Sequence, residues 1–171
     1  KGRMYYRLGL NYAPSDFKLK SAQEGFEVTR TYEAVDDISH VKKDSKGVWH
    51  FKSGERVRVR ILMFNRSVRY HVALVDKLPA GLEAINMALL GQGDAPTRGT
   101  LKEQKDTKRH SQYWIRHQNM RDERCEAFCT YLYAGYHEFA FVCRATNVGE
   151  FVVPPAKAEE MYSPEVFGRS S

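Results

Sequence analysis

Cysteine is scarce in this sequence, with three among 171 residues, and an odd number of thiols cannot all pair within one chain. Cys125 and Cys129 are four residues apart in a segment that alternates like one β-strand. At roughly 3.3 Å per residue they lie about 13 Å apart, which exceeds the roughly 7 Å limit for a disulfide. Cys143 lies on the next predicted strand, where a cross-strand disulfide is geometrically awkward. We therefore predict three buried free thiols, as in a reducing compartment or where burial protects them.

Long apolar runs are also missing, and a membrane-spanning helix needs roughly 20 apolar residues, so we predict no membrane span in this chain. The chain begins at Lys1 without an initiator Met or a cationic leader. We expect it to be a piece of a longer protein, whose targeting signals lie elsewhere and whose compartment the residues leave open.

Metal and nucleophile motifs are missing too, since no His-Glu-x-x-His, His-x-His or Cys-x-x-Cys spacing occurs. The glycine-rich stretch 91–94 has no serine, cysteine or lysine, as a nucleophile elbow or phosphate loop would require. We therefore predict no metal and no cofactor. The histidines lie scattered at His40, His50, His71, His110, His117 and His137.

Neighbouring carboxylates are the remaining catalytic candidates, because glycoside hydrolysis uses a pair of them. Adjacent acids in loops are more often turn formers and solvated charges, so a hydrolase is only a minor alternative and we predict that the chain is not an enzyme. The pairs are Asp36-Asp37, Asp122-Glu123 and Glu159-Glu160.

Basic residues exceed acidic ones by 27 to 21, for a formal net charge of +6. Arg56, Arg58 and Arg60 form a stripe that phosphate groups could bind. Glu55 and Asp106 interrupt the basic runs, and solvent-facing strands commonly alternate in charge, so we predict no nucleic acid partner.

What the sequence does contain is period-two alternation of apolar residues, the pattern of half-buried strands. Seven or eight such strands, without heptads or βαβ units, predict an all-β fold: one domain over residues 1–171, an antiparallel immunoglobulin-like β-sandwich. We expect at most a short helix, at Leu82–Leu90, and one long polar loop, at Gly91–Arg109. The apolar faces are Met4/Tyr6/Leu8/Leu10, Phe26/Val28/Tyr32, Val57/Val59/Ile61/Met63, Tyr70/Val72/Leu74, Cys125/Ala127/Cys129/Tyr131 and Phe139/Phe141/Cys143.

Turn residues predict two hairpins. A strand at Val48–Phe51 reverses onto the strand that starts at Arg56, and Arg124–Leu132 pairs with His137–Ala145.

The tail is predicted from its prolines. Pro154 and Pro155 end a strand that runs through Phe151 and Val153. The chain then turns through Lys157–Tyr162 and resumes as an extended piece at Glu165–Arg169.

Several stretches resemble the C-terminal macroglobulin domain, counted as the tenth, of bacterial-type α2-macroglobulins. The resemblance spans nearly the whole chain in order and spacing. It is carried by Tyr5–Pro14, Gly25–Val28, Tyr32–Asp37, Tyr70–Asp76 with Leu78–Gly81, Arg121–Arg124, Arg144–Thr146 and the tail Phe151–Arg169.

This resemblance implies a non-enzymatic part of a large endopeptidase inhibitor of the bacterial periplasm or cell envelope. Such inhibitors trap a protease after it cleaves a bait segment, and they expose a reactive thioester. The domain is expected to pack on the thioester domain and neighbouring macroglobulin domains, with target proteases met through the parent chain. Leu101–Gln104 has Leu where a thioester needs Cys, so the thioester is expected elsewhere in the parent. The three cysteines depart from the family pattern.

The acidic turn of Glu159, Glu160, Met161 and Tyr162 is our first candidate for interdomain contact, because Met and Tyr add apolar contact area. Arg121 and Asp122 are the second candidate. Two alternatives stay open: these residues only join the tail to its own sandwich, or Arg121–Arg124 forms a local ion-pair network.

The alternative function is a stand-alone carbohydrate- or ligand-binding β-sandwich. In it, Tyr113 and Trp114 serve as a stacking platform.

Overall fold

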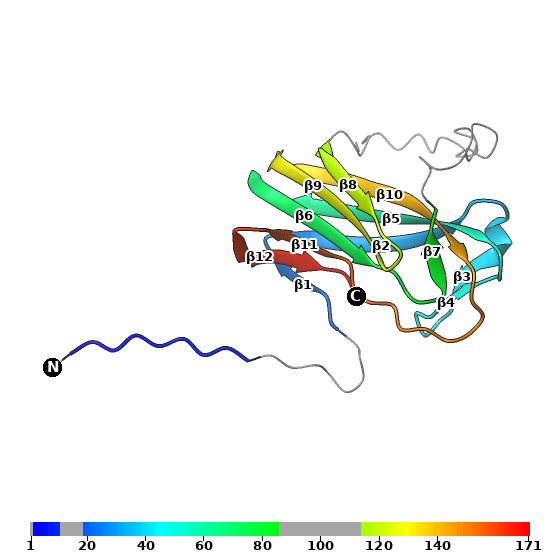
Figure 1. Ribbon diagram of the computed structural model, residues 1–171, viewed down its shortest axis with the longest axis horizontal. Helices are drawn as coiled ribbons and strands as arrows, with labels where there is room; N and C mark the ends of the chain where they lie inside the picture. The colour runs from blue at the N-terminus through cyan, green and yellow to red at the C-terminus, as the bar shows by residue number, and fades with distance from the viewer. Residues whose placement is uncertain (1, 11–18, 86–113) are drawn as a thin grey trace.

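The computed structural model describes residues 2–10, 19–85 and 114–171, and these form an antiparallel β-sandwich with one short 3₁₀ helix, η1 (Ile38–His40) (Figure 1). A six-stranded sheet in the order β1-β12-β11-β6-β9-β8 faces a four-stranded sheet in the order β2-β5-β10-β7. The predicted fold class is confirmed. The strands are β1 (Ala22–Glu24), β2 (Glu27–Ala34), β3 (Val41–Lys43), β4 (Trp49–Phe51), β5 (Arg56–Asn65), β6 (Arg69–Lys77), β7 (Leu82–Ala84), β8 (His117–Met120), β9 (Arg124–Leu132), β10 (Gly135–Ala145), β11 (Lys157–Glu160) and β12 (Ser163–Arg169).

Strand β5 organises the smaller sheet, because it pairs with β2 on one side and with β10 on the other. Its alternation is as predicted: Val57, Val59, Ile61 and Met63 are fully buried, while the arginines between them are half-buried on the other face. Successive side chains of a strand point to opposite faces, so one strand supplies both core and surface. The predicted apolar residues of β10 are also buried.

In the larger sheet the predicted alternation holds only over the middle of the strands. Val72 and Leu74 of β6 are buried, as are the cysteines of β9. Tyr70 and its cross-strand partner Tyr131 were predicted to share these buried faces, and this is wrong, since they are 56% and 43% exposed. His71 has a positive φ of 48°, so the regular extended backbone of β6 is interrupted between Tyr70 and the core residues.

Both predicted hairpins are wrong in their pairing. Strand β4 pairs with β3 instead of β5, and β9 and β10 follow each other in the chain but lie in different sheets. β10 pairs with β5 from Gly135 to Arg144, and β9 pairs with β6 and β8. The turn at Gly135 therefore connects the two sheets. The apolar alternation of two consecutive strands is the same whether they pair as a hairpin or lie in facing sheets, so the sequence pattern could not distinguish the two.

The helix predicted at Leu82–Leu90 is wrong where it can be compared, because Leu82–Ala84 is strand β7, paired with β10. Residues 86–90 and the polar loop predicted at 91–109 lie outside the described residues.

The tail also differs from its prediction. No strand runs through Phe151 and Val153. The Phe151 ring instead covers two glycines, where an added Cβ would lie 2.6 Å from the ring at Gly81 and 3.1 Å at Gly149. The ring thus packs beside the start of β7 without pairing with it. Lys157–Glu160, predicted as a turn, is strand β11, and the last extended piece is confirmed as β12.

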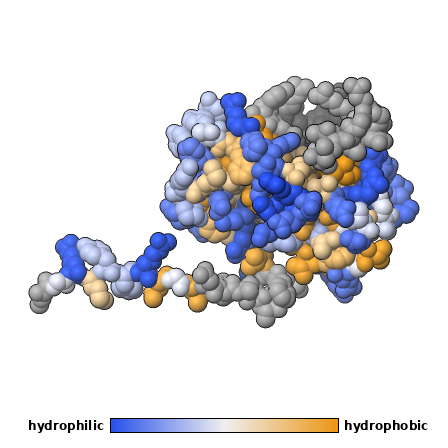
Figure 2. All heavy atoms as spheres, viewed as in Figure 1, coloured by the Kyte–Doolittle hydropathy of each residue, from blue (hydrophilic) through white to orange (hydrophobic). Residues whose placement is uncertain are grey.

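The first predicted strand, with Met4, Tyr6, Leu8 and Leu10 on one face, is not a strand of this sandwich. Residues 2–10 form an arm that projects from the domain (Figures 1 and 2). The four side chains are 78–88% exposed. Among the described residues, no helix is long and apolar enough to cross a membrane.

A buried ion pair connects the two sheets. The side chains of Arg30 in β2 and Asp76 in β6 are 3% and 1% exposed and form a direct salt bridge, and Arg30 Nη2 also donates to the carbonyl of Pro154 at 2.7 Å. Burial raises the pKa of Asp76 to about 6, against the opposing influence of the Arg30 guanidinium.

We expect Arg30→Met or Asp76→Leu alone to lower the free energy of unfolding by about 3–5 kcal/mol, because each leaves an unpaired polar or charged group in the core. The double variant should lose far less, about 1 kcal/mol, because no buried charge remains and only the Pro154 carbonyl lacks its donor. Urea unfolding of the unsubstituted protein, the two single variants and the double variant measures these free energies. A double variant whose loss equals the sum of the two single losses would contradict the expectation.

All three cysteines are free and buried, as predicted. Cys125 and Cys129 lie on β9, whereas Cys143 lies on β10 of the facing sheet. Burial raises the pKa of Cys125 to about 12 and of Cys129 to about 11, and it raises that of Cys143 as well.

We therefore expect the native protein to react very slowly with a thiol reagent at neutral pH, because reaction needs an accessible thiolate. After unfolding in guanidinium, all three thiols should react. A colorimetric disulfide reagent measures both states, and rapid labelling of any thiol before unfolding would disprove the expectation.

Candidate functional site

The first candidate contact region lies at the turn between β11 and β12. Met161 and Tyr162 form this turn and are 45% and 79% exposed. Strand β11 is held between β12 and β6, so the turn projects from one end of the six-stranded sheet, at the left of Figure 1. Met161 and Tyr162 are thus exposed on a hairpin whose first strand, β11, is paired on both sides.

Hydrogen bonds fix the backbone of this turn. The Met161 N–H donates to the His71 carbonyl at 2.9 Å, and the Tyr70 N–H donates to Glu160 Oε1 at 2.9 Å. The Tyr162 ring meets His71 edge-on, with ring centroids 5.1 Å apart and an interplanar angle of 84°. The turn is therefore anchored to β6 while its side chains face solvent.

Exposed tyrosines also lie on the neighbouring strands β6 and β9 and just after β9. Tyr131 contacts Tyr70 and Tyr133, with ring centroids 5.4 and 4.7 Å apart, and Tyr133 is 70% exposed. We call Met161, Tyr162, Tyr70, Tyr131 and Tyr133 the tip surface. Sequence reasoning missed Tyr70 and Tyr131 because strict alternation assigned them to the core, and it did not consider Tyr133. A usable signal was the position of all three near strand ends, where an amphipathic ring is often half-exposed.

The two acidic residues of this candidate serve the domain's own structure. Glu159 forms an ion pair with Lys157, and Glu160 accepts the Tyr70 N–H. The apolar side chains that follow them are the exposed part of the hairpin.

The second candidate, Arg121 and Asp122, lies in the β8–β9 turn, and both residues are exposed. In the sheet Glu160 pairs with Val72, while Arg124 pairs with Lys77. Five residues of β6 therefore separate the two regions, or roughly 16 Å. The structure does not bring the two candidates together.

Ion pairs around Arg124 support the local interpretation of the second candidate. Arg124 pairs with Glu123 and Glu126. Glu123 is one of the two carboxylates of the acidic pair Asp122-Glu123, and its negative charge is neutralised by the neighbouring Arg124.

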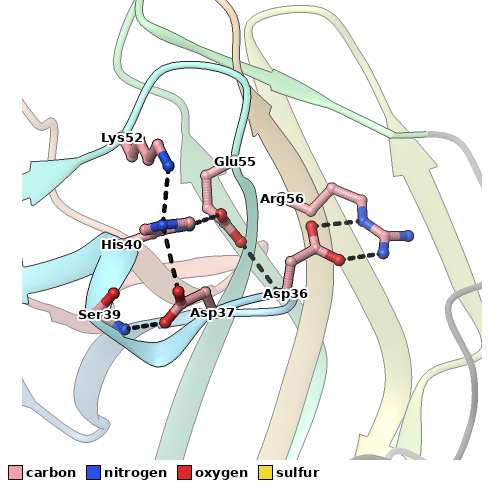
Figure 3. A network of polar contacts seen from close by, with 7 residues as sticks. All are labelled: Asp36, Asp37, Ser39, His40, Lys52, Glu55 and Arg56. Atoms are coloured by element: carbon pink, nitrogen blue, oxygen red, sulfur yellow. Dashed lines mark hydrogen bonds and ion pairs between the residues drawn. The ribbon is translucent and has the colours of Figure 1, made fainter.

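The acidic pair Asp36-Asp37 belongs to a polar network at the end of β2 (Figure 3). Arg56 binds Asp36 through two nitrogens and lowers the pKa of this carboxyl. Asp37 accepts the Ser39 N–H at 2.9 Å, which lowers its pKa. A general acid needs a raised pKa, so neither carboxyl suits that role.

His40 joins the same network, also drawn in Figure 3. Its Nδ1 lies 2.6 Å from Glu55 Oε2, and Lys52 Nζ lies 3.0 Å from its Nε2. Glu55 is buried and also accepts the Asp36 N–H at 3.1 Å. These contacts hold η1 and the start of β3 against the start of β5, which is a structural role.

The remaining predicted sites have structural partners. Trp114 is buried and its Nε1–H donates to the Glu138 carbonyl at 2.9 Å, so it is not available as a stacking platform, and Tyr113 lies outside the described residues. Arg60 of the basic stripe pairs with Glu33 and Glu138, each at 3.0 Å. In the ranges 2–10, 19–85 and 114–171, no three His, Cys, Asp or Glu side chains gather as a metal site would require.

A family model described as "Bacterial Alpha-2-macroglobulin MG10 domain" matches residues 25–165. The chain belongs to this family. Its sandwich is therefore a macroglobulin domain of the bacterial α2-macroglobulin type, and the arm of residues 2–10 lies before the matched region.

Two relatives with different names match this chain. "Circularly permutated Ras protein 2" of Dictyostelium discoideum is 32% identical over 172 residues, which is all of this chain but 4% of that protein. "Alpha-2-macroglobulin" of Xylella fastidiosa (strain 9a5c) is 29% identical over 117 residues, which is 68% of this chain and 7% of that protein. The chain thus spans only a small part of the relatives that it matches.

Solved structures of Escherichia coli α2-macroglobulin share the fold. The form activated by porcine elastase superposes with a TM-score of 0.68 at 23% identity, covering 90% of this chain and 13% of that one. A native fragment from domain MG7 to the C-terminus gives 0.64 at 22% identity, covering 88% of this chain and 23% of that one. In those proteins the macroglobulin domain is one part of a much longer chain.

We expect Tyr162→Ala to change the free energy of unfolding by less than about 0.5 kcal/mol, because its ring is mostly exposed. Phe139→Ala, in the core, should cost about 3–5 kcal/mol. Thermal and urea unfolding compare the two. A large loss for Tyr162→Ala would show that the tip surface stabilises its own domain and is not kept for a partner.

Proposed function

We propose that this chain is the C-terminal, tenth macroglobulin domain of a bacterial-type α2-macroglobulin, a large protein that inhibits endopeptidases by trapping them. The family match supports the type of parent protein. In the proposed role the domain has no catalytic activity and acts through contacts with other domains of the parent chain. Its acidic pairs support this view, because each is engaged in ion pairs, backbone hydrogen bonds or a helix cap.

We further propose that the tip surface docks on the thioester domain and helps to exclude water from the thioester before a protease is trapped. The observation that carries this proposal is the contrast at the β11–β12 turn. Its backbone is anchored to β6, whereas Met161 and Tyr162 are exposed. Binding costs less when the contact residues are already ordered. Aromatic residues and Met are also enriched at protein interfaces.

The Dictyostelium relative favours a second candidate role. The domain matches a protein whose name does not describe an inhibitor, at 32% identity. In this second role the domain is a docking module inside another type of long multidomain chain. The tip surface would then contact a different neighbouring domain.

We expect Met161→Ala or Tyr162→Ala in the full-length parent to accelerate the release of a free thiol in the uncleaved protein by at least about tenfold, the equivalent of about 1.4 kcal/mol. Water or methylamine then reaches the thioester more easily. Thiol release is followed with a fluorescent maleimide, and protease capture is measured in parallel.

Ile38→Ala is the matched control, because Ile38 is 90% exposed but lies on η1, away from the tip surface. If both tip variants release the thiol no faster than Ile38→Ala does, the shielding role is overturned. A parent sequence without a Cys-x-Glu-Gln segment would overturn the inhibitor proposal and favour the second candidate.

A further inference from the structure

We propose that residues 3–10 form a β-strand that completes a sheet of a neighbouring domain in the parent chain. The family match supports the existence of such a parent, but the inference does not depend on the thioester. It starts from a conflict between the arm's sequence, which is that of a half-buried strand, and its surroundings in this structure.

The composition of the arm is unlike that of a linker. Five of its eight residues are large and apolar or aromatic, and the others are two arginines and one glycine. Flexible linkers are rich in glycine, serine, proline or charge instead. All five large side chains are exposed, from 78% for Tyr6 to 88% for Leu8. Such a segment, left free, is an aggregation hazard, so a partner is expected to cover it.

The spacing of these residues favours a strand over a helix. Met4, Tyr6, Leu8 and Leu10 fall at every second position and share one face of a strand. In an α-helix, residues two positions apart lie about 200° apart around the axis, so this set would be split between opposite sides. The other face of the strand has Arg3, Tyr5 and Arg7, which suits solvent or a polar interface.

The partner is not this sandwich. In the part of the chain that the structure describes, the two sheet edges of the large sheet are β1 and β8 and those of the small sheet are β2 and β7, and none of them pairs with the arm. The arm also lies before residue 25, where the family match begins. Figures 1 and 2 show it clear of the domain.

The relatives point to a neighbouring domain as the occupant. This chain spans 4% and 7% of the Dictyostelium and Xylella relatives, so most of such a protein lies outside the described domain. Eight extended residues cover roughly 26 Å, the length of an ordinary sandwich strand. The partner surface is thus an open sheet edge with unpaired backbone N–H and C=O groups above an apolar core. The arm adds a strand there, with its apolar face inward.

The test is hydrogen exchange of the arm in the full-length parent, compared with the 171-residue chain. We expect the amides of residues 3–10 to exchange at least about 100-fold more slowly in the parent, because strand pairing protects them. Equally fast exchange in both proteins would overturn the inference.

Two adjacent tyrosines provide a matched pair of variants. In the parent, Tyr6→Asp should reduce the arm's protection at least about tenfold, because it places a charge in an apolar core, whereas Tyr5→Asp should change it less than about threefold. An equal loss of protection in Tyr6→Asp and Tyr5→Asp would overturn the proposal that the arm is a strand with one buried and one exposed face. Circular dichroism of the variant 171-residue chains checks that the domain itself is intact.

A second copy of this chain is the competing occupant. If the isolated chain forms dimers in sedimentation experiments and its arm is protected only in the dimer, the inference is overturned. Protection of the arm in a parent whose thiol release is unaffected by the tip variants would uphold the inference and reject the shielding role.

Discussion

The buried ion pair between Arg30 and Asp76 is the interaction on which the arrangement of the site depends. Charges removed from water must be neutralised, so β2 of one sheet and β6 of the other are held in one relative position. Arg30 also binds the Pro154 carbonyl, which fixes the segment that leads into β11 beside β6. The exposed turn that follows β11 is therefore placed by a charge in the core.

Charged side chains on the surface are also engaged by partners within the domain. Most of the carboxylates that sequence reasoning considered for catalysis are engaged in ion pairs, by backbone donors or in a helix cap, as the Asp36 and Asp37 contacts show. Large exposed apolar side chains gather at the tip surface, at one end of the large sheet, and on the arm of residues 3–10. Both features fit a module whose role is to contact other domains.

Much of the core was predictable from sequence, because burial in a sandwich follows the two-residue period of a strand. Strands β2, β5 and β10 and the middle of β6 and β9 have the predicted inward faces. Met161 and Tyr162 were singled out from the sequence as contact residues, and the structure shows that they are exposed; their contact with another domain stays a prediction. The exposure of Tyr70 and Tyr131 was not predicted, because the alternation breaks near the ends of both strands: at His71, with its positive φ, on β6, and at Thr130 and Tyr131, which are both exposed, on β9.

The sequence by itself determined that apolar side chains alternate along extended segments, and hence the all-β class, most of the core residues and the burial of three free thiols. Only the tertiary structure decided which strand pairs with which, that β9 and β10 belong to different sheets, and that none of the described strands pairs with the amphipathic arm. The physical reason is that alternation depends on neighbours along the chain. Pairing depends on backbone groups and facing surfaces contributed by segments far apart in sequence, or by another domain.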